Sequence, residues 1–144
     1  MKKVINVLFL LFFFLTISIF ANAATLALSP SSGSQTSGST FSVNILLDTQ
    51  SVAIDGVDIV YLNYNPLLLE VQDEDSGTTG VQISAGNLLA STLANSVDTT
   101  NGRIQFSQTS SGGTTFNGSG TLATVRFRVA STGTASVTFD FTLG

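Results

Sequence analysis

The sequence predicts an all-β protein in which two antiparallel sheets pack together as a sandwich. Three observations support this fold class. Apolar and polar residues alternate over short segments, as they do in strands with one buried face. Stretches rich in glycine, serine and threonine separate these segments, which is typical of turns. No segment has a sustained helical periodicity of apolar residues.

Residues 1–23 have the form of a processing segment. Lys2 and Lys3 give a basic start, residues 4–20 are almost wholly apolar, and Ala21-Asn22-Ala23 has the small-x-small form of a signal peptidase site. The apolar run falls short of the roughly 20 residues that span a bilayer. We therefore expect a signal peptide and a secreted protein, with an uncleaved anchor as the alternative. The chain has no cysteine, so a lipid cannot be attached at one.

The composition of the remaining residues, 24–144, indicates a single domain without catalytic machinery. Three arginines face nine acidic residues, a net charge of −6, so there is no basic footprint for a nucleic acid. Without cysteine, no disulfide stabilises the exported domain. Histidine is absent, and with it the commonest general base and metal ligand. We expect a binding or structural module that has no cofactor and is not an enzyme.

Two strands are expected before residue 50. Residues 25–30 alternate apolar with small side chains and end at a proline, as a short first strand can. Residues 41–48 alternate cleanly, with Phe41 and Val43 among the side chains that point inward. Between them, residues 31–40 contain no apolar side chain and are expected to form a turn region.

The stretch 54–71 organises the rest of the chain. Its first part is rich in β-branched and aromatic residues of high strand propensity. This strand must end at Asn65-Pro66, because proline lacks a backbone donor and disfavours helical geometry in the residue before it. Three leucines then lead into a short strand around residues 70–71.

The apolar face of the long strand changes phase halfway along. Val57 and Ile59 share one face, but Leu62 and Tyr64 continue the apolar pattern in the opposite phase. Since a one-residue slip turns every later side chain to the other face, one extra residue near 59–60 would form a β-bulge. The alternative is a strand buried on both faces.

An acidic turn and a polar stretch follow. Asp73, Glu74 and Asp75 are either calcium ligands or solvated carboxylates, and their spacing is not that of an EF-hand. We expect a strand at 81–84, a turn with an apolar plug at 85–90, and a polar loop at 91–102.

Three further alternating segments complete the pattern, at 103–108, 121–129 and 137–143. Ile104 and Phe106 point inward from the first. The last segment is aromatic-rich and would leave an unpaired edge, which natural proteins normally cover. We therefore expect the domain to be incomplete at its C-terminus, with at least one strand missing.

In its order of motifs the chain resembles a cohesin domain, over nearly all of residues 24–143. The matching segments are Leu62-Asn-Tyr-Asn-Pro66, Leu69-Glu-Val71, Ala85-Gly-Asn-Leu-Leu89, Gly102-Arg-Ile-Gln-Phe-Ser107, Gly118-Ser-Gly-Thr-Leu-Ala-Thr-Val-Arg-Phe127 and Gly133-Thr-Ala-Ser-Val-Thr-Phe139. The resemblance implies a β-sandwich of nine-stranded jelly-roll topology, about eight of whose strands are present in this sequence.

The resemblance also implies a function. Cohesins bind the dockerin module of another protein, and the calcium is carried in the dockerin's own loops. The dockerin lies across one sheet, and the residues here that correspond to its contacts are Asp58, Gln108 and Gly112. We expect Asp58 and Gln108 to point outward; for Asp58 the alternative is a solvated carboxylate without a recognition role. The usual Tyr-Asp-Pro of the family is Tyr64-Asn65-Pro66 in this chain. Gly56 and Gln108 also stand where well-known members have other polar residues, so the choice of dockerin does not carry over.

Three function classes follow from these expectations. The favoured one is a secreted, cell-surface scaffolding module with a dockerin-like protein partner. The second is a carbohydrate-binding module that binds polysaccharide. Such modules stack exposed aromatic rings on sugars, whereas this chain has no tryptophan, and we expect at least one of Tyr61 and Tyr64 to be buried. The third, a hydrolase, would need a pair of carboxylates about 5–10 Å apart, and no pair stands out.

Overall fold

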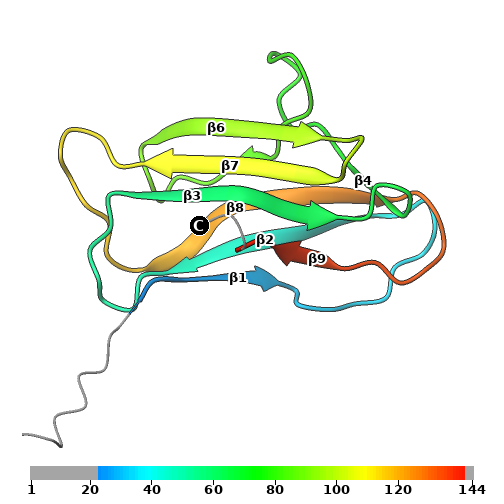
Figure 1. The fold of residues 1–144 in the computed structure, drawn as a ribbon, viewed down its shortest axis with the longest axis horizontal. Helices are drawn as coiled ribbons and strands as arrows, with labels where there is room; N and C mark the ends of the chain where they lie inside the picture. The colour runs from blue at the N-terminus through cyan, green and yellow to red at the C-terminus, as the bar shows by residue number, and fades with distance from the viewer. Residues whose placement is uncertain (1–22, 142–144) are drawn as a thin grey trace, which may run out of the picture.

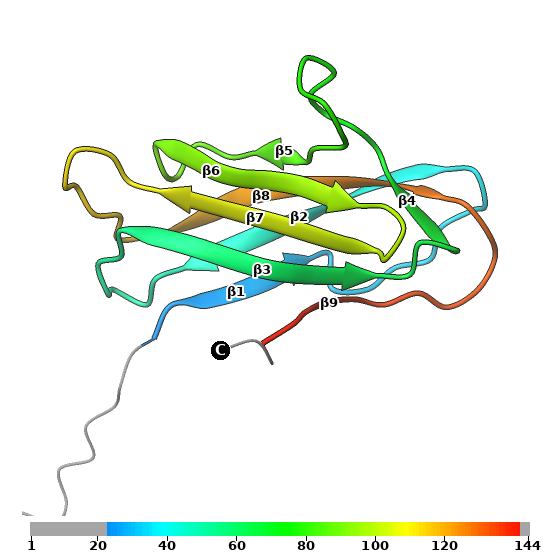
Figure 2. The same cartoon turned by 45° about the horizontal axis from the view of Figure 1, so that its top comes forward.

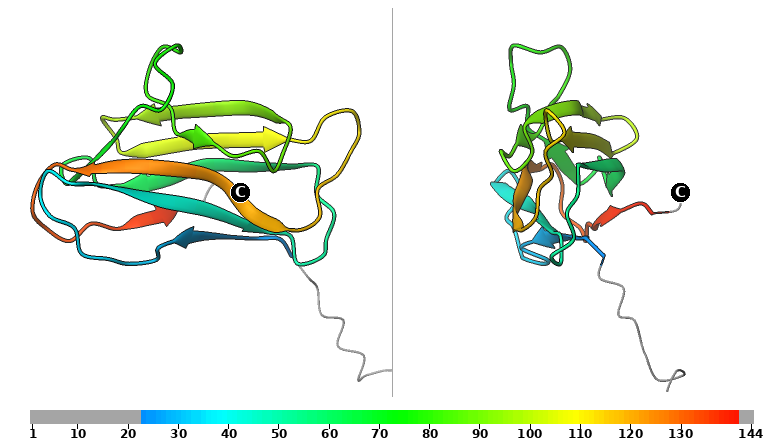
Figure 3. Two further views of the ribbon diagram at one scale, coloured as in Figure 1. Left: turned by 180° about the vertical axis from the view of Figure 1, so that it is seen from behind. Right: turned by 90° about the vertical axis from the view of Figure 1, so that its left-hand side faces the viewer.

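The computed structural model describes residues 23–141 and has nine strands arranged in two packed sheets. One sheet has the order β1-β2-β8-β4, with the short β5 also paired to β8, and the other has the order β6-β7-β3-β9. The two layers are clear in Figure 1 and in the end-on view of Figure 3. The strands are β1 (Thr25–Ser29), β2 (Thr40–Asp48), β3 (Gly56–Tyr64), β4 (Leu69–Val71), β5 (Ser84–Ala85), β6 (Ser91–Asp98), β7 (Arg103–Thr109), β8 (Ser119–Val129) and β9 (Val137–Phe139).

Every strand pair is antiparallel, and the chain passes repeatedly from one sheet to the other. These passages fall between β2 and β3, β3 and β4, β5 and β6, β7 and β8, and β8 and β9. The all-β sandwich of jelly-roll type expected from the sequence is confirmed. Within residues 23–141 no helix is long and apolar enough to cross a membrane.

The core lies between the sheets and is built from the inward side chains of both. Phe106 and Ile104 of β7 and Leu62 of β3 are fully buried against Ile45 of β2 and Phe127 of β8. Burying a side chain of this size contributes roughly 1.5–3 kcal/mol. Since the chain has no disulfide, this packing is the main source of stability.

The bulge expected in the long strand is confirmed. The pairing of β3 with β7 shifts register between Ile59 and Leu62, so Val57, Ile59, Leu62 and Tyr64 all pack in or against the core. The proline corner is also confirmed. β3 ends at Tyr64, and the carbonyl oxygen of Asn65 accepts hydrogen bonds from the backbone amides of Leu68 and Leu69.

Two sequence expectations are wrong. Residues 91–98 form the eight-residue strand β6 instead of a polar loop, because they pair with β7 along its whole length. The strand expected at 81–84 is displaced to Ser84–Ala85. Residues 81–83 instead run beside β6. The side-chain amide of Asn95 on β6 accepts a hydrogen bond from the backbone amide of Ile83 and donates one to its carbonyl, and the backbone amide of Val97 donates to the carbonyl of Val81.

The last strand is shorter than expected. β9 pairs with β3 only over Val137–Phe139, and Phe141 is 78% exposed. β9 and β1 lie at the same open side of the sandwich (Figure 2), where a cavity of about 550 Å³ is lined in part by Leu28, Phe41 and Val137. The strand that raises the count to nine is β6, which lies in a stretch expected to be a loop. The expectation of a further strand after the last one therefore stays a prediction. The expected signal peptide, residues 1–23, lies outside the described residues except for Ala23, and it stays a prediction.

Candidate functional site

The predicted site residues lie on or beside the sheet β6-β7-β3-β9. Asp58 lies on β3 and Gln108 on β7, the two adjacent central strands of this sheet. Gly112 lies in the loop between β7 and β8, which is hydrogen-bonded through Ser110 and Phe116 to Asp55 and Ile54, just before β3. The fold therefore brings all three to one end of one sheet. They differ, however, in how far each is exposed to a partner.

Asp58 is exposed on the outer face, as expected. Its partner in the ladder on β7 is Ser107, and Ala94 of β6 pairs with Ser107 on the far side. The cross-strand neighbours of the Asp58 carboxylate on this face therefore have small side chains. Within residues 23–141 the carboxylate of Asp58 makes no hydrogen bond or ion pair, so it is available to a partner.

Gln108 does not point outward, and that expectation is wrong. Its side chain is only 2% exposed. The amide nitrogen donates to the carbonyl of Gly86 at 2.9 Å and to Thr92 Oγ1 at 3.1 Å, tying together segments that belong to different sheets. The physical reason is the two-residue period of a strand. The alternation that turns Ile104 and Phe106 inward also turns Gln108 inward.

Gly112 lies in an open loop. Its φ of +64° is in the left-handed region that favours glycine, and a Cβ added there would meet nothing within 4 Å. The loop is held at its far end, where Phe116 and Ile54 exchange backbone hydrogen bonds of 2.7 and 2.9 Å. Gly112 is therefore a position where another backbone can approach closely.

The newly found strand β6 adds an apolar contact to this face. The register with β7 shifts between Thr92 and Ala94, and Leu93 at this bulge is 70% exposed. Sequence reasoning missed this residue because Leu93, Ala94 and Val97 do not alternate in phase. An exposed leucine beside the small side chains of Ala94 and Ser107 is a suitable apolar centre for a protein contact.

At the other end of the same face, Arg103 of β7 lies over the ring of Tyr61 of β3. The guanidinium carbon is 4.8 Å from the ring centroid, within the range of a cation–π interaction. The sequence did not indicate a contact between these two residues. The register shift in β3 makes the pair, since it turns Tyr61 out while Leu62 and Tyr64 stay buried. That one of the two tyrosines is buried confirms the expectation, and burial raises the pKa of the Tyr64 hydroxyl.

Asp98 on β6 pairs with Arg103 in the ladder, but its oxygens are already occupied. They accept hydrogen bonds from the backbone amides of Thr100 and Asn101 and from the side-chain amide of Asn101. The bond from the Asn101 side chain is the main cause that lowers the pKa of Asp98, and the charge of Arg103 adds to it. The carboxylate thus stabilises the turn between β6 and β7.

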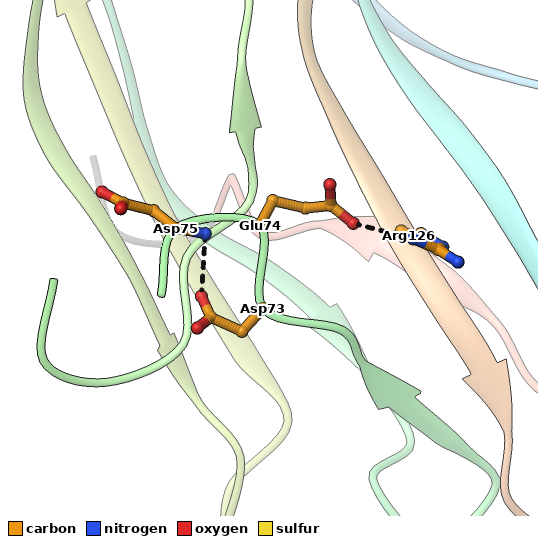
Figure 4. Close-up of polar contacts among 4 residues, drawn as sticks. All are labelled: Asp73, Glu74, Asp75 and Arg126. Carbon is orange, nitrogen blue, oxygen red and sulfur yellow. Dashed lines mark hydrogen bonds and ion pairs between the residues drawn. The ribbon is translucent and has the colours of Figure 1, made fainter. Parts of the chain in front are cut away.

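The acidic turn after β4 lies away from this face, in the connection that projects from the sandwich (Figures 2 and 4). Asp73 Oδ1 accepts from the amides of Asp75 and Gln82, and Asp75 accepts from Gly77 and Thr78. Glu74 pairs with Arg126 at 3.6 Å. In Figure 4 the three acidic side chains point in different directions. Among residues 23–141 no group of three or more candidate ligands is placed to hold a metal ion.

Comparison with known proteins gives one family. The sequence profile of the cohesin domain matches residues 26–144. No curated protein is similar enough to this chain to count as a relative.

Several solved structures share the fold, all from Acetivibrio cellulolyticus. The second type II cohesin module of the adaptor ScaA scaffoldin is 18% identical, with a TM-score of 0.62, covering 87% of this chain and 74% of that one. A type II cohesin domain from the cellulosome is 20% identical, with a TM-score of 0.61, covering 84% and 75%. A type II cohesin–X-dockerin complex is 16% identical, with a TM-score of 0.57, covering 85% and 80%.

Proposed function

Because the chain belongs to the cohesin family, we propose that it recognises a dockerin-type module of another protein through the outer face of the sheet β6-β7-β3-β9. Cohesin domains are binding modules without catalytic activity, which agrees with the lack of histidine and cysteine. One solved structure of similar fold is a cohesin–X-dockerin complex, which supports a partner of this kind.

The observation that carries the proposal is the character of this face around Asp58. The carboxylate is exposed above the small side chains of Ser107 and Ala94, and Leu93 provides an apolar contact nearby. A flat, mostly polar surface with a modest apolar centre is typical of non-obligate protein interfaces. Gly112 extends this surface, since the open loop allows close backbone approach.

Gln108 belongs to the proposed site in a supporting role. Because its side chain is buried, we assign it no direct contact with the partner. Its hydrogen bonds to Gly86 and Thr92 fix the start of β6 against β7. It thereby keeps Leu93 and Ala94 in place beside Asp58.

The proposed setting follows from the family and from the sequence. A chain with an export signal would act outside the cell, in scaffolding of cell-surface or polysaccharide-degrading assemblies. The family resemblance implies that the dockerin carries the calcium needed for the interaction, while Asp73 and Asp75 of this chain accept hydrogen bonds within their own turn. Chelation should therefore abolish capture through the partner and leave the unfolding of this chain unchanged.

The alternative of a polysaccharide-binding module has less support. Stacking on sugar rings needs exposed aromatic rings in a row. On this sheet face Tyr61 lies under Arg103, and Tyr64 points into the core. Phe141 is exposed, but it lies beyond the end of β9.

The test is a capture experiment with the dockerin modules encoded in the source genome, run beside sedimentation with insoluble cellulose and chitin. We expect calcium-dependent capture of at least one dockerin and no sedimentation. Asp58→Ala should weaken binding by roughly 1–3 kcal/mol, about 5- to 150-fold. Glu70→Ala, which removes one negative charge from the opposite sheet, is the matched control and should change the affinity less than about twofold. Sedimentation with polysaccharide and no captured dockerin would reject the proposal.

A further inference from the structure

Arg103 differs from the other two arginines of the described region in having no bound carboxylate. Arg126 pairs with Glu74 and Arg128 with Glu70, both in the five-stranded sheet or its connections. Within residues 23–141 the guanidinium of Arg103 donates no hydrogen bond and forms no ion pair. Its one direct contact of this kind is with the ring of Tyr61, at 4.8 Å from the centroid.

The neighbours of Arg103 explain why its donors are unused. In the ladder it lies between Asp98 of β6 and Asn63 of β3. The carboxylate of Asp98 is occupied by the backbone and side chain of the turn 98–101. The side-chain amide of Asn63 is 3.5 Å from Asp140 Oδ2. Both flanking polar groups therefore have other partners.

The position of Arg103 is also fixed. It directly follows Gly102, whose carbonyl accepts a hydrogen bond of 2.8 Å from the amide of Tyr64. The aromatic ring beneath the guanidinium restricts its orientation further. An arginine that is already ordered loses little additional entropy when it binds, and its planar fork of five donors matches the two oxygens of a carboxylate.

We propose that Arg103, supported by Tyr61, receives a carboxylate side chain of the bound partner. This inference rests on the proposed function, since it assigns the chemistry of one contact on the same face. The occupant is an aspartate or glutamate of the dockerin-type module. The charges near Arg103 on this face are negative: Asp58 on β3, Asp98 on β6, and Asp140, which is hydrogen-bonded to Asn63 and Tyr61 of β3. Arg103 is therefore the position on this face where an acidic side chain is attracted.

The first experiment uses a dockerin that the wild-type chain captures. Arg103→Gln should weaken its binding about tenfold or more and reduce the dependence of affinity on salt. Arg103→Lys should recover only part of the loss, because lysine lacks the planar fork. Tyr61→Leu should also weaken binding, whereas Arg128→Gln, which removes the same charge from the opposite sheet, should change it less than about twofold. Equal unfolding midpoints would show that the Arg103 variants fold normally.

The partner residue is then found by replacing the acidic side chains of the dockerin one at a time by their amides. One replacement should reproduce the loss caused by Arg103→Gln, and the two changes together should cost little more than either alone. If no amide replacement does so, the acceptor is a backbone carbonyl and the proposal is wrong. Arg103→Gln binding as tightly as wild type would overturn it directly.

A second experiment does not depend on the dockerin, so the two proposals can fail separately. Side-chain Nε–Hε signals of the three arginines are followed by NMR while acetate is added to the whole chain. The signal of Arg103 should shift more than those of Arg126 and Arg128, and Tyr61→Leu should reduce that difference. Equal shifts for all three arginines would contradict a preformed carboxylate site, whether or not any dockerin is captured.

Discussion

Gly102 offers a quantitative test of how the two central strands of the binding face are held together. It ends the turn between β6 and β7 with φ +66°, and a Cβ added there would lie 2.2 Å from the carbonyl oxygen of Tyr64 and 2.7 Å from Pro66 Cδ. The left-handed conformation costs alanine roughly 1–2 kcal/mol. The overlap is with backbone, so it can be relieved only by loosening the 2.8 Å hydrogen bond between Tyr64 and Gly102. Weakening that bond adds about 1–3 kcal/mol.

Gly102→Ala should therefore lower the free energy of unfolding by roughly 2–5 kcal/mol, a large part of the total for a domain of this size. Gly112→Ala is the matched control. Its φ is +64°, nearly the same, but its Cβ would meet nothing within 4 Å, so only the conformational cost of about 1–2 kcal/mol applies. Urea unfolding followed by circular dichroism measures both. Equal losses in the two variants would refute the claim that close packing against Tyr64 fixes this turn.

Three further predictions concern the chain as a whole. Hydrogen bonds from the side chains of Thr78 and Asn101 are the main cause that lowers the pKa values of Asp75 and Asp98. The stabilising effect of these carboxylates is therefore present above the carboxyl pKa of the unfolded chain and is lost as the pH falls through the lowered values. Amide exchange measured across the acidic range should show both turns loosening there, and unchanged protection would contradict this. N-terminal sequencing of the exported protein should give Ala24 as the first residue, whereas an intact Met1 would favour the uncleaved anchor. Residues 24–144 alone should self-associate as concentration rises, because in the described region β1 pairs only with β2 and β9 only with β3; a monomer that unfolds cooperatively at high temperature would argue against a missing strand.

The sequence was sufficient for the elements whose pattern comes from the core. The phase change in β3 predicted the bulge between Ile59 and Leu62 correctly, because each half of the strand must bury its own apolar residues. Asn65-Pro66 marked the end of β3 for a purely local reason. In β8 the alternation of residues 121–129 places Val125 and Phe127 in the core, where both are fully buried.

Strand β6 could not be predicted in this way. Its residues are mostly small and polar. Its extended form depends on pairing with β7 and on the two hydrogen bonds between the side chain of Asn95 and the backbone of Ile83. These interactions join segments that local propensity does not connect. No residue of this edge strand is fully buried, and Val97 is only partly buried against the core, so the strand leaves a weak period in the sequence.

The exposure of the candidate site residues was predicted only in part, and their contact with a partner stays a prediction. Asp58 and Gly112 are exposed as a contact residue and a contact loop should be. The expectation for Gln108 follows the family resemblance and is wrong, because the two-residue period that buries Ile104 and Phe106 also buries Gln108. Arg103 and Tyr61 were missed because the contact depends on the register across the bulge, which the sequence indicates only approximately.

The central claim is that the partner covers the outer face of the sheet β6-β7-β3-β9, and hydrogen exchange of the chain with and without a captured dockerin tests it most directly. Binding should slow exchange in β3, β6 and β7 and in the loop that carries Gly112. It should leave β1, β2 and β8 of the opposite sheet unchanged. Protection confined to the opposite sheet, or to the open side between β1 and β9, would contradict the account.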